Sequence, residues 1–512
     1  MKKIFLIILT TCISLGIFAQ KVVNIKDRGA RSSDQTGNTA IIQKAIDEVS
    51  SAGGGTVIIP AGRFVTAILT LKSNVNLHLD KYAVLAGSTK RADYGPSSQV
   101  SALIVANKAT NISITGEGMI DGQGEALLKD IYVMLNAGTL QDKEWKTENP
   151  WHQVRPEEEN RPKIIDFDFC KNVTIKGITL RNALCWVQRY NQCENLTVDS
   201  IYVESNIFWN NDGIDLVDCK NATISNSFFN CDDDGICFKS SDRNSRCENI
   251  VVCNCVVRSS ASAIKFGTAS WGGFKNITVK DIFVYDTFRS AVAMEAVDGG
   301  VMDNVTIENI KAVNTGNALV IRLGHRNKDE VISSLRNVTI RNLDVEVPRI
   351  KPDIGYNMEG PSKRYPHNVF PSSATGIPGH AVENVLIENV KISYKGGADK
   401  NVACFGLDSL NRVPEKISDY PEFSMFGELP SWGFYVRHVN GIQFKNVTVG
   451  FDESDFRPAY VFDDVTGLLL NNVEVKSATE MPVIVLKNTN KPVIEGLKLP
   501  LQDKKAIRYI KK

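Results

Sequence analysis

The sequence has no excess of charge of either sign and only one long apolar run. Lysine and arginine number 59 and aspartate and glutamate 58 in 512 residues, with no dense basic run. A nucleic-acid binder carries a basic patch on one face, so nucleic acid is not an expected partner. After the apolar run at the amino end, no stretch reaches the ~18 to 20 apolar residues of a membrane-spanning helix. We therefore expect no membrane span.

The one apolar run has the form of a secretory signal. Lys2 and Lys3 form the positively charged n-region, the apolar stretch extends from Ile4 to Phe18, and Ala19 supplies a small residue for cleavage. We expect residues 1–19 to be removed as a signal peptide. The remaining chain, residues 20–512, is then expected in the periplasm or outside the cell.

Cysteine is concentrated in one part of the chain. Of the 11 cysteines, all except Cys12 and Cys404 lie between Cys170 and Cys255. Disulfides form readily in exported proteins, whereas buried thiols in a repetitive β structure act as small apolar residues. Both alternatives stay open, because the sequence alone cannot give disulfide connectivity.

A short pattern, an asparagine followed by alternating apolar residues, recurs through most of the chain. The spacings between its clear copies are 23, 26, 28, 27, 28 and 33 residues. A unit of this size buries its apolar face only by stacking on its neighbours, so a repeat of this length indicates a solenoid. The clear copies begin at Asn172, Asn195, Asn221, Asn249, Asn276, Asn304 and Asn337, and weaker copies begin at Asn384 and Asn446.

Each repeat contains short runs of β-branched residues separated by Gly, Asn and Asp, which is typical of strands and tight turns. We therefore predict an all-β fold, a single-stranded right-handed parallel β-helix that forms one domain over residues 20–512. The stacked asparagines would hydrogen-bond along its axis. Several copies also read as Asn-x-Thr glycosylation acceptors, but their regular spacing favours the structural role.

Helical spacing and insertions break the repeat. Apolar residues from Thr39 to Val49 recur at helical spacing, which predicts a short helix within an amino-terminal cap of about residues 20–100 that covers the open end of the solenoid. Insertions at about 122–162, 348–380 and 403–438 are expected to form loops on one face, often the binding face. The last is rich in aromatic residues, which either contact a ligand or pack the loop against the solenoid: Tyr420, Phe423, Phe426, Trp432, Phe434 and Tyr435.

Acidic residues cluster in two successive repeats. The motif Asn210–Gly213 is followed about one coil later by Asp233–Gly235. When the glycines of the two motifs are aligned, Asp212 lies beside Asp234 on the neighbouring coil, and Asp233 lies next to both. Like charges this close cannot all ionise, so at least one pKa should rise and an acid should stand beside a base.

Such a pair of carboxyl groups suits glycoside hydrolysis, in which one acid protonates the leaving oxygen and another carboxylate activates water. Each motif taken alone also fits two simpler roles. Asp-Gly and Asn-Asp pairs form ordinary turns, and clustered Asp oxygens also suit calcium. Two motifs in register one coil apart favour the catalytic role.

These residues resemble the polygalacturonase-like glycoside hydrolases of family 28, and the resemblance covers nearly all of the mature chain. It implies an inverting hydrolase that cleaves α-glycosidic bonds of a pectic polysaccharide containing galacturonic acid, without a cofactor or a metal ion. By the same resemblance Asp233 is the general acid, while Asp212 and Asp234 position the attacking water. The stretches that carry it are Gly53–Gly62, Asp121–Gly124, Arg161-Pro162 and both aspartate motifs.

Two elements of the family pattern are missing. The family's Gly-His-Gly corresponds to Ala261–Ala263, and its Arg-Ile-Lys corresponds to Ala293–Glu295. A glutamate that faces a uronate carboxylate repels it. A decorated or different pectic substrate is therefore expected in place of simple homogalacturonan.

Stacking the coils suggests residues that replace these elements. We call a set of residues at equivalent positions on successive coils a column. The alignment puts Arg289 in the column of Asp233, and a second column contains Lys239, Glu295 and Arg322. A guanidinium fork matches a carboxylate, so either arginine is a candidate for binding an acidic sugar; the alternative is a charge ladder that serves the fold. The candidate substrate-binding residues are Asn210, Lys239, Lys265, Arg289, Glu295 and Arg322.

The expected partner is a pectic polysaccharide or oligosaccharide, and the protein is expected to be a monomer. Long loops that block one end of the groove would make the enzyme exo-acting. Two further classes fit part of the sequence: a β-helix polysaccharide lyase, which would use a basic residue and often Ca²⁺, and a non-catalytic carbohydrate-binding solenoid. The paired aspartate motifs favour hydrolysis over both.

Overall fold

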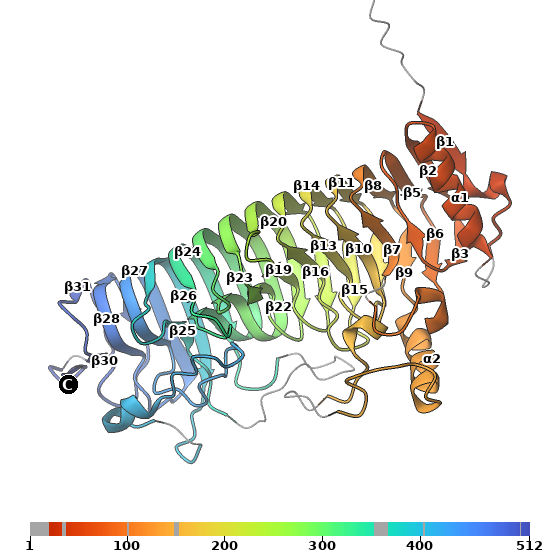
Figure 1. Cartoon of the computed structure of the whole chain (residues 1–512). Coiled ribbons are helices and arrows are strands. Elements are labelled where there is room, and N and C mark those ends of the chain that lie inside the picture. The colour runs from red at the N-terminus through yellow and green to blue at the C-terminus, as the bar shows by residue number, and fades with distance from the viewer. Residues whose placement is uncertain are drawn as a thin grey trace, which may run out of the picture.

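The computed structural model describes residues 20–32, 37–99, 102–147, 153–352, 367–402, 405–501 and 503–511. The chain winds into coils that stack along one axis, and every coil pairs in parallel with the next (Figure 1). The prediction of a right-handed parallel β-helix is confirmed. The predicted signal peptide lies outside the described residues. Among the helices that the structure does describe, we find none with the length and apolar character needed to cross a membrane.

Three sheets run along the solenoid. The first sheet begins with β1 (Lys21–Asn24), β2 (Gly55–Ile59), β5 (Val75–Leu79), β8 (Thr110–Gly116), β11 (Lys171–Lys176), β14 (Glu194–Asp199) and β17 (Lys220–Ser225). The second begins with β3 (Gly62–Thr66), β6 (Ala83–Gly87), β9 (Met119–Asp121), β12 (Thr179–Arg181), β15 (Tyr202–Ser205) and β18 (Phe228–Cys231). The third contains β4 (Leu69–Thr70), β7 (Ala102–Asn107), β10 (Lys163–Asp168), β13 (Gln188–Asn191), β16 (Ile214–Val217), β19 (Ile236–Ser240), β21 (Ile264–Ser270) and β25 (Ser372–Thr375).

In the later coils, single long strands bend from one sheet into the next. These strands are β20 (Cys247–Ser259), β22 (Gly273–Ala296), β23 (Val301–Leu323), β24 (Ser334–Val347), β26 (Val382–Gly396), β27 (Phe434–Glu453) and β28 (Tyr460–Asn471). Four short strands end the solenoid: β29 (Glu474–Val475), β30 (Ile484–Lys487), β31 (Val493–Glu495) and β32 (Ile507–Ile510). The helices are α1 (Asn38–Ser51), α2 (Gly124–Asn136) and the 3₁₀ turns η1 (Ile25–Arg28), η2 (Arg91–Tyr94), η3 (Glu158–Asn160) and η4 (Leu407–Arg412).

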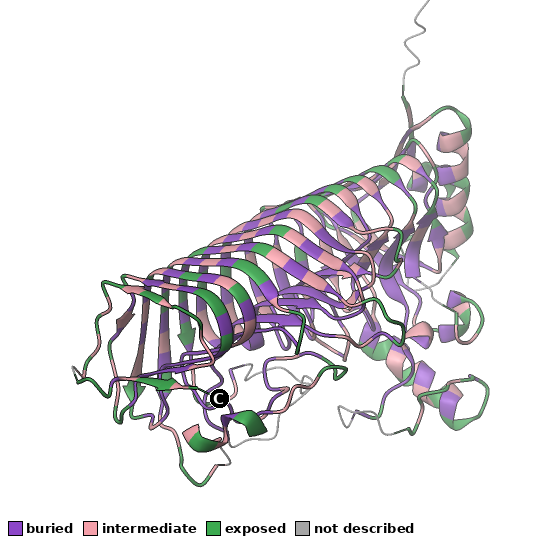
Figure 2. Ribbon diagram, turned by 60° about the vertical axis from the view of Figure 1, so that its left-hand side comes forward, coloured by how far each residue is buried: buried purple, intermediate pink, exposed green. Residues whose placement is uncertain are grey.

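The core follows from the alternation of side chains along each strand, since every second residue points into the coil. In the third sheet, Ile214, Ile236, Ile264 and Val292 stack in register on successive coils, and all are fully buried. Buried positions recur from coil to coil as bands along the solenoid (Figure 2). A stack of aliphatic side chains therefore runs inside the coils and leaves the alternate positions of the sheet facing outward.

The asparagine ladder is confirmed. Each repeat asparagine adopts a left-handed backbone, with φ between 54° and 58°, a conformation that Asn tolerates better than most residues. The side-chain amide of Asn249 donates to Asn221 at 3.2 Å, and that of Asn276 donates to Asn249 at 3.1 Å. The ladder departs from the prediction at two of the asparagines: Asn337 donates to Asp303 at 2.7 Å, and Asn446 donates to Asn389 of a neighbouring ladder at 3.0 Å and not to Asn384.

The nine cysteines from Cys170 to Cys255 are free thiols, so the structure favours the second alternative for them. All are buried except Cys253, which is half-buried. Four occupy equivalent inward positions on successive coils, because each precedes a paired residue of the first sheet. Burial raises the pKa of the Cys247 thiol to about 12. These four are Cys170, Cys193, Cys219 and Cys247.

Helix α1 confirms the predicted cap. Its buried residues Ile42, Ile46 and Val49 recur at helical spacing and pack on the first coils. Described parts of the predicted insertions project from one side of the solenoid, where α2 and loops of the carboxyl half lie below the sheets (Figure 1). The predicted bounds 348–380 and 403–438 are too wide, because β25 and the start of β27 belong to the third sheet. We call residues 405–431, the loop that precedes β27, the strap. It lies across earlier coils and contacts Arg322 and His325.

Candidate active site

The two aspartate motifs lie in the turns between the second and third sheets, where β15 leads to β16 and β18 leads to β19. The Gly213 amide donates to the carbonyl of Asp234 at 2.9 Å, and Ile214 pairs with Ile236. These contacts confirm the predicted alignment of Asp212 with Asp234. The nearest carboxylate oxygens of the two residues lie within 4.8 Å of each other.

Asp212 is held by a buried lysine. Lys239 Nζ lies 2.8 Å from Asp212 Oδ2 and also contacts Asp215. The Lys239 side chain is only 12% exposed and its ammonium lies 4.3 Å from the centre of the Trp186 ring, which shields the ion pair from water. Lys239 was expected to bind substrate, and the structure corrects this: its ammonium is committed to the carboxylates.

The protons in this cluster are distributed unequally. Burial and the neighbouring Asp212 raise the pKa of Asp215 well above its ordinary value. Burial also raises the pKa of Asp212, but Lys239 opposes that rise. Lys239 opposes the rise at both carboxyl groups, and Asp215 is the more deeply buried of the two, 0% against 4% exposed, so Asp212 is the more readily ionised one, which suits a base.

Asp233 has the properties of an acid. Burial raises its pKa well above its ordinary value, and the nearby Asp212 and Asp234 raise it further. Its Oδ1 accepts the backbone N–H of Asp234 at 2.9 Å, and its Oδ2 accepts the amide of Asn210 at 3.3 Å. A carboxyl group with a raised pKa thus stands beside Asp212 and Asp234, as the alignment of the two motifs predicted.

Asn210 is a positioning residue in this structure and was expected to bind substrate. Its Oδ1 accepts Arg161 at 2.9 Å and also accepts Arg155. Because both guanidinium groups occupy the oxygen, the amide nitrogen is oriented toward Asp233. Arg161 is fully buried and also donates to the carbonyl of Trp209 at 2.7 Å. The insertion at 122–162 therefore positions Asp233 indirectly, because its two arginines hold Asn210.

The cluster does not suit a calcium ion. Calcium prefers six to eight oxygen ligands, whereas the third group within 4.8 Å of Asp212 and Asp234 is the Cys237 thiol. The Lys239 ammonium lies 3.0 Å from that sulfur and already supplies a positive charge. The donors present therefore favour acid–base chemistry over calcium binding.

Lys265 and Glu295 form a buried ion pair, with 2.7 Å between Lys265 Nζ and Glu295 Oε1. Their side chains are 1% and 0% exposed. Burial raises the pKa of Glu295 to about 7 although Lys265 opposes it. The expectation that these two residues bind substrate directly is corrected, because neither reaches the surface.

Arg322 is likewise removed from the surface. The predicted column is right, since Arg322 pairs with Glu295 along the sheet. The alternative of a charge ladder does not hold, because the Arg322 guanidinium donates to the carbonyls of Gly376 at 2.9 Å, Glu415 at 2.8 Å and Lys416 at 2.9 Å. Arg322 therefore binds the strap and is not available to an acidic sugar.

Arg289 lies where the alignment placed it, two coils beyond Asp233. Its backbone amide donates to the Ala261 carbonyl at 2.8 Å. Burial lowers the pKa of Arg289, but the fields of Tyr420, Glu422 and the two aspartates of the second motif outweigh burial and raise it. Arg289 is thus a charged group at the edge of the aspartate cluster.

The strap brings one aromatic side chain to this edge. The Tyr420 ring centre lies 5.8 Å from Lys265 Nζ and 6.0 Å from the Arg326 guanidinium carbon. Tyr420 is 39% exposed. The other aromatic residues of this insertion pack inside, each at most 7% exposed: Phe423, Phe426, Trp432, Phe434 and Tyr435.

His438 fastens the strap and should make its attachment depend on pH. His438 Nε2 lies 3.1 Å from Glu415 and Nδ1 lies 2.6 Å from Asp464. Burial lowers the pKa of His438 and Arg437 also opposes protonation, but the two carboxylates prevail and raise it. A raised histidine pKa stabilises the fold below the unfolded value of about 6.5, and this contribution is lost as pH rises through the folded pKa.

We therefore expect His438→Gln to lower stability at pH 5.5 by about 1 kcal/mol, a value limited by the exposure of Asp464. At pH 8.5 the variant and the wild type should unfold at closely similar temperatures. Thermal melting at both pH values checks this. An equal loss of stability at the two pH values would contradict stabilisation by protonated His438 and its two carboxylates.

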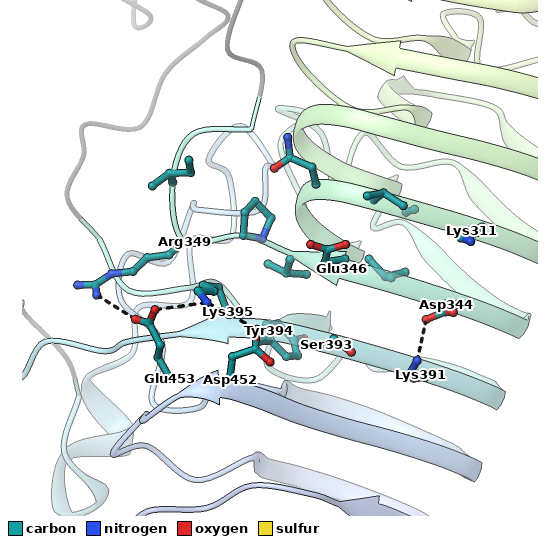
Figure 3. A pocket seen from close by; sticks show the side chains of 17 residues that line it. Lys311, Asp344, Glu346, Arg349, Lys391, Ser393, Tyr394, Lys395, Asp452 and Glu453 are labelled. Atoms are coloured by element: carbon teal, nitrogen blue, oxygen red, sulfur yellow. Dashed lines mark ion pairs between the residues drawn. The ribbon is translucent and has the colours of Figure 1, made fainter.

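A separate hollow of about 700 Å³ lies beside β24, β26 and β27. Several of its charged residues pair with each other: Lys395 lies 3.4 Å from Glu453, and Lys391 lies 3.7 Å from Asp344 (Figure 3). These pairs are about half exposed, and such pairs contribute little. The hollow contains none of the aspartates of the two motifs, so the candidate active site remains with them.

Comparisons with known proteins identify relatives of this chain. The sequence profile of "Glycosyl hydrolases family 28" matches residues 50–409. An exo-poly-alpha-D-galacturonosidase of Dickeya chrysanthemi is 24% identical over an alignment of 456 positions that covers 75% of this chain and 74% of that protein. An endo-polygalacturonase of Pectobacterium carotovorum subsp. carotovorum is 26% identical over 62% of this chain and 81% of that protein.

A solved structure shows the same fold. The exopolygalacturonase of Thermotoga maritima superposes with a TM-score of 0.51 at 22% identity, over 73% of this chain and 88% of that one. The family profile covers both aspartate motifs and most of the solenoid. The chain therefore belongs to family 28 of the glycosyl hydrolases and is a glycoside hydrolase.

Proposed function

We propose that the protein hydrolyses α-glycosidic bonds of galacturonic acid residues in a pectic polysaccharide or oligosaccharide, with inversion. The observation that carries the proposal is the carboxyl cluster of the two motifs: Asp212 and Asp234 have oxygens within 4.8 Å of each other, and Asp233, held by Asn210 and the Asp234 amide, has a raised pKa. In the proposed reaction Asp233 gives its proton to the leaving oxygen. Asp212 and Asp234 hold a water molecule and take its proton as it attacks the opposite face of the sugar.

The substrate class is supported by the named activities of the relatives. A guanidinium suits a uronate carboxylate, but Arg289 is only 3% exposed, so it adds positive charge near the aspartates without an open fork for the sugar. A lyase would need an accessible base. Lys239 does not supply one, because Asp212 and Asp215 raise its pKa well above the ordinary value despite burial.

Product analysis tests the proposal. The protein is incubated with homogalacturonan, rhamnogalacturonan and galacturonide oligosaccharides, and the products are followed by chromatography and proton NMR. We expect saturated products whose new anomeric centre is β when first formed. Unsaturated products absorbing in the ultraviolet would indicate a lyase instead, and binding without release would indicate a carbohydrate-binding solenoid.

We also propose export, supported by the lysines and the apolar run of the first 19 residues. Amino-terminal sequencing of protein recovered from the periplasm or medium should begin near Gln20. Recovery of the uncleaved chain from the cytoplasm alone would contradict the proposal.

A further inference from the structure

Lys163 is a largely buried lysine on the amino-terminal side of the aspartates. It begins β10, which pairs with β13, and β13 pairs with β16, the strand that follows Asp212. Lys163 Nζ lies 5.4 Å from the centre of the Trp186 ring, and the Lys239 ammonium that holds Asp212 lies 4.3 Å from the same centre. One half-buried indole ring therefore connects Lys163 to the aspartate cluster.

The charge of Lys163 has no counter-charge in contact with it. The residue is 6% exposed, yet in the part of the chain that the structure describes no carboxylate or carbonyl oxygen pairs with its ammonium. Contact with an indole ring replaces only part of the hydration that a buried ammonium loses. The nitrogen is not among the partnerless side-chain atoms that are closed off from solvent. A ligand can therefore reach the charged end of this lysine.

The carboxylates that flank Lys163 in the sequence are held by arginines. Asp166, three residues later on β10, accepts Arg189 Nε at 2.6 Å. Burial raises the pKa of Asp166, and the charges of Arg189 and Lys163 oppose that rise. Glu158, before β10, lies 3.7 Å from Arg155. These pairs leave the positive charge of Lys163 for an anion from outside the protein.

We propose that Lys163 binds a uronate carboxylate of the substrate. This inference rests on the proposed hydrolysis and names the group that recognises the acidic sugar. The family's Arg-Ile-Lys element is missing, and Lys265 and Arg322 on the later coils are committed to Glu295 and to the strap. Two coils, roughly 10 Å of the solenoid axis, separate Lys163 from Asp212. The carboxylate therefore belongs to a neighbour of the sugar whose bond is cleaved.

The first test is the split between KM and kcat on a galacturonide trimer. Lys163→Met keeps the length of the side chain and removes its charge, and the fold should persist because no carboxylate loses a partner. We expect KM to rise about 10 to 100-fold, the range for loss of a charge-assisted hydrogen bond, while kcat stays within about threefold. Lys163→Arg restores a cation and should recover most of the affinity.

A neutral ligand separates recognition of the carboxylate from general support of the site. In an Asp233→Asn background, calorimetry measures Kd without turnover for the galacturonide trimer and for its carboxyl-reduced form. Lys163→Met should weaken binding of the acidic trimer and leave binding of the neutral trimer unchanged. Lys171→Met is the matched control, because Lys171 follows on the same coil and forms an exposed pair with Glu194 at 3.0 Å on the first sheet.

Three results would overturn the proposed role of Lys163. The first is an unchanged KM and Kd in a Lys163→Met protein that is folded by circular dichroism. The second is an equal loss of affinity for the acidic and the neutral trimer. The third, which needs no variant of Lys163, is an equal Kd for the two trimers in the Asp233→Asn protein. Binding of the acidic trimer through Lys163 without product release by the wild type would instead refute the proposed hydrolysis.

Discussion

Asp233→Asn should lower kcat by about 10² to 10⁴-fold, the range usual for loss of a general acid. The asparagine keeps the shape of the carboxyl and can retain the contact with Asn210, so the fold should persist. It has no proton to give to the leaving oxygen. Steady-state rates on a galacturonide oligosaccharide measure the loss.

Two substrates with different leaving groups distinguish the role of Asp233 as the acid from the roles of Asp212 and Asp234. An aryl galacturonide whose phenol is acidic leaves with little protonation, so Asp233→Asn should lose much less activity on it than on a sugar leaving group. Asp212→Asn and Asp234→Asn should lose activity on both substrates, because water activation is still required. Asp344→Asn, in an exposed pair away from the site, should match the wild type. An equal loss by Asp233→Asn on the two substrates would argue against its role as the acid.

Lys239→Met should lower both activity and stability. Methionine fills similar space but leaves two buried carboxyl groups without their cation, and removal of one partner of a buried ion pair costs about 3 to 5 kcal/mol. The pKa of Asp212 should then rise further, because only Lys239 opposed the effect of burial. Below that pKa, each unit of rise lowers the ionised fraction about tenfold. The acid limb of the profile of kcat/KM against pH should move to higher pH.

A second substitution distinguishes positioning from simple structural support. In Lys239→Met with Asp215→Asn, one of the two carboxyl groups is removed, so the melting temperature and the acid limb should both recover in part. Lys391→Met, in an exposed pair, serves as the control. If Lys239→Met melts earlier but keeps the wild-type pH profile, Lys239 supports the fold and does not tune Asp212.

The sequence predicted the coils and the columns because these depend on local signals. The asparagines need a left-handed turn in every repeat, and the glycines of the two aspartate motifs set the register of Asp212 against Asp234. Arg289 also lies in the predicted column. The position of each residue along its coil was thus readable from spacing alone.

Contacts between columns were not readable in the same way. Lys265 and Glu295 stand on different columns, and they meet because long side chains lean diagonally across one coil. Lys239 reaches Asp212 and Asp215 by the same kind of lean. Column alignment therefore found these residues but assigned them the wrong partners.

The roles of Arg322 and Tyr420 depended on the strap. An insertion carries no repeat, so its path over the solenoid has no signal in the spacing. Only the aromatic content of the insertion indicated a surface that contacts either a ligand or the sheet, and in the structure Tyr420 is half-exposed at the site while its neighbours pack inside. Arg161 could be found as a family motif, but its contact with Asn210 required the three-dimensional path of the insertion at 122–162.

The strap also separates two properties of the enzyme along the chain. The groups proposed to break the bond lie within residues 210–239, on coils whose register is fixed by the core. The strap lies in an insertion almost two hundred residues later, outside any coil, and packs on coils beyond the aspartates. An altered strap could therefore change which bond reaches the aspartates and leave the bond-breaking groups as they are, so that members of one family could diverge in substrate by exchange of a single loop.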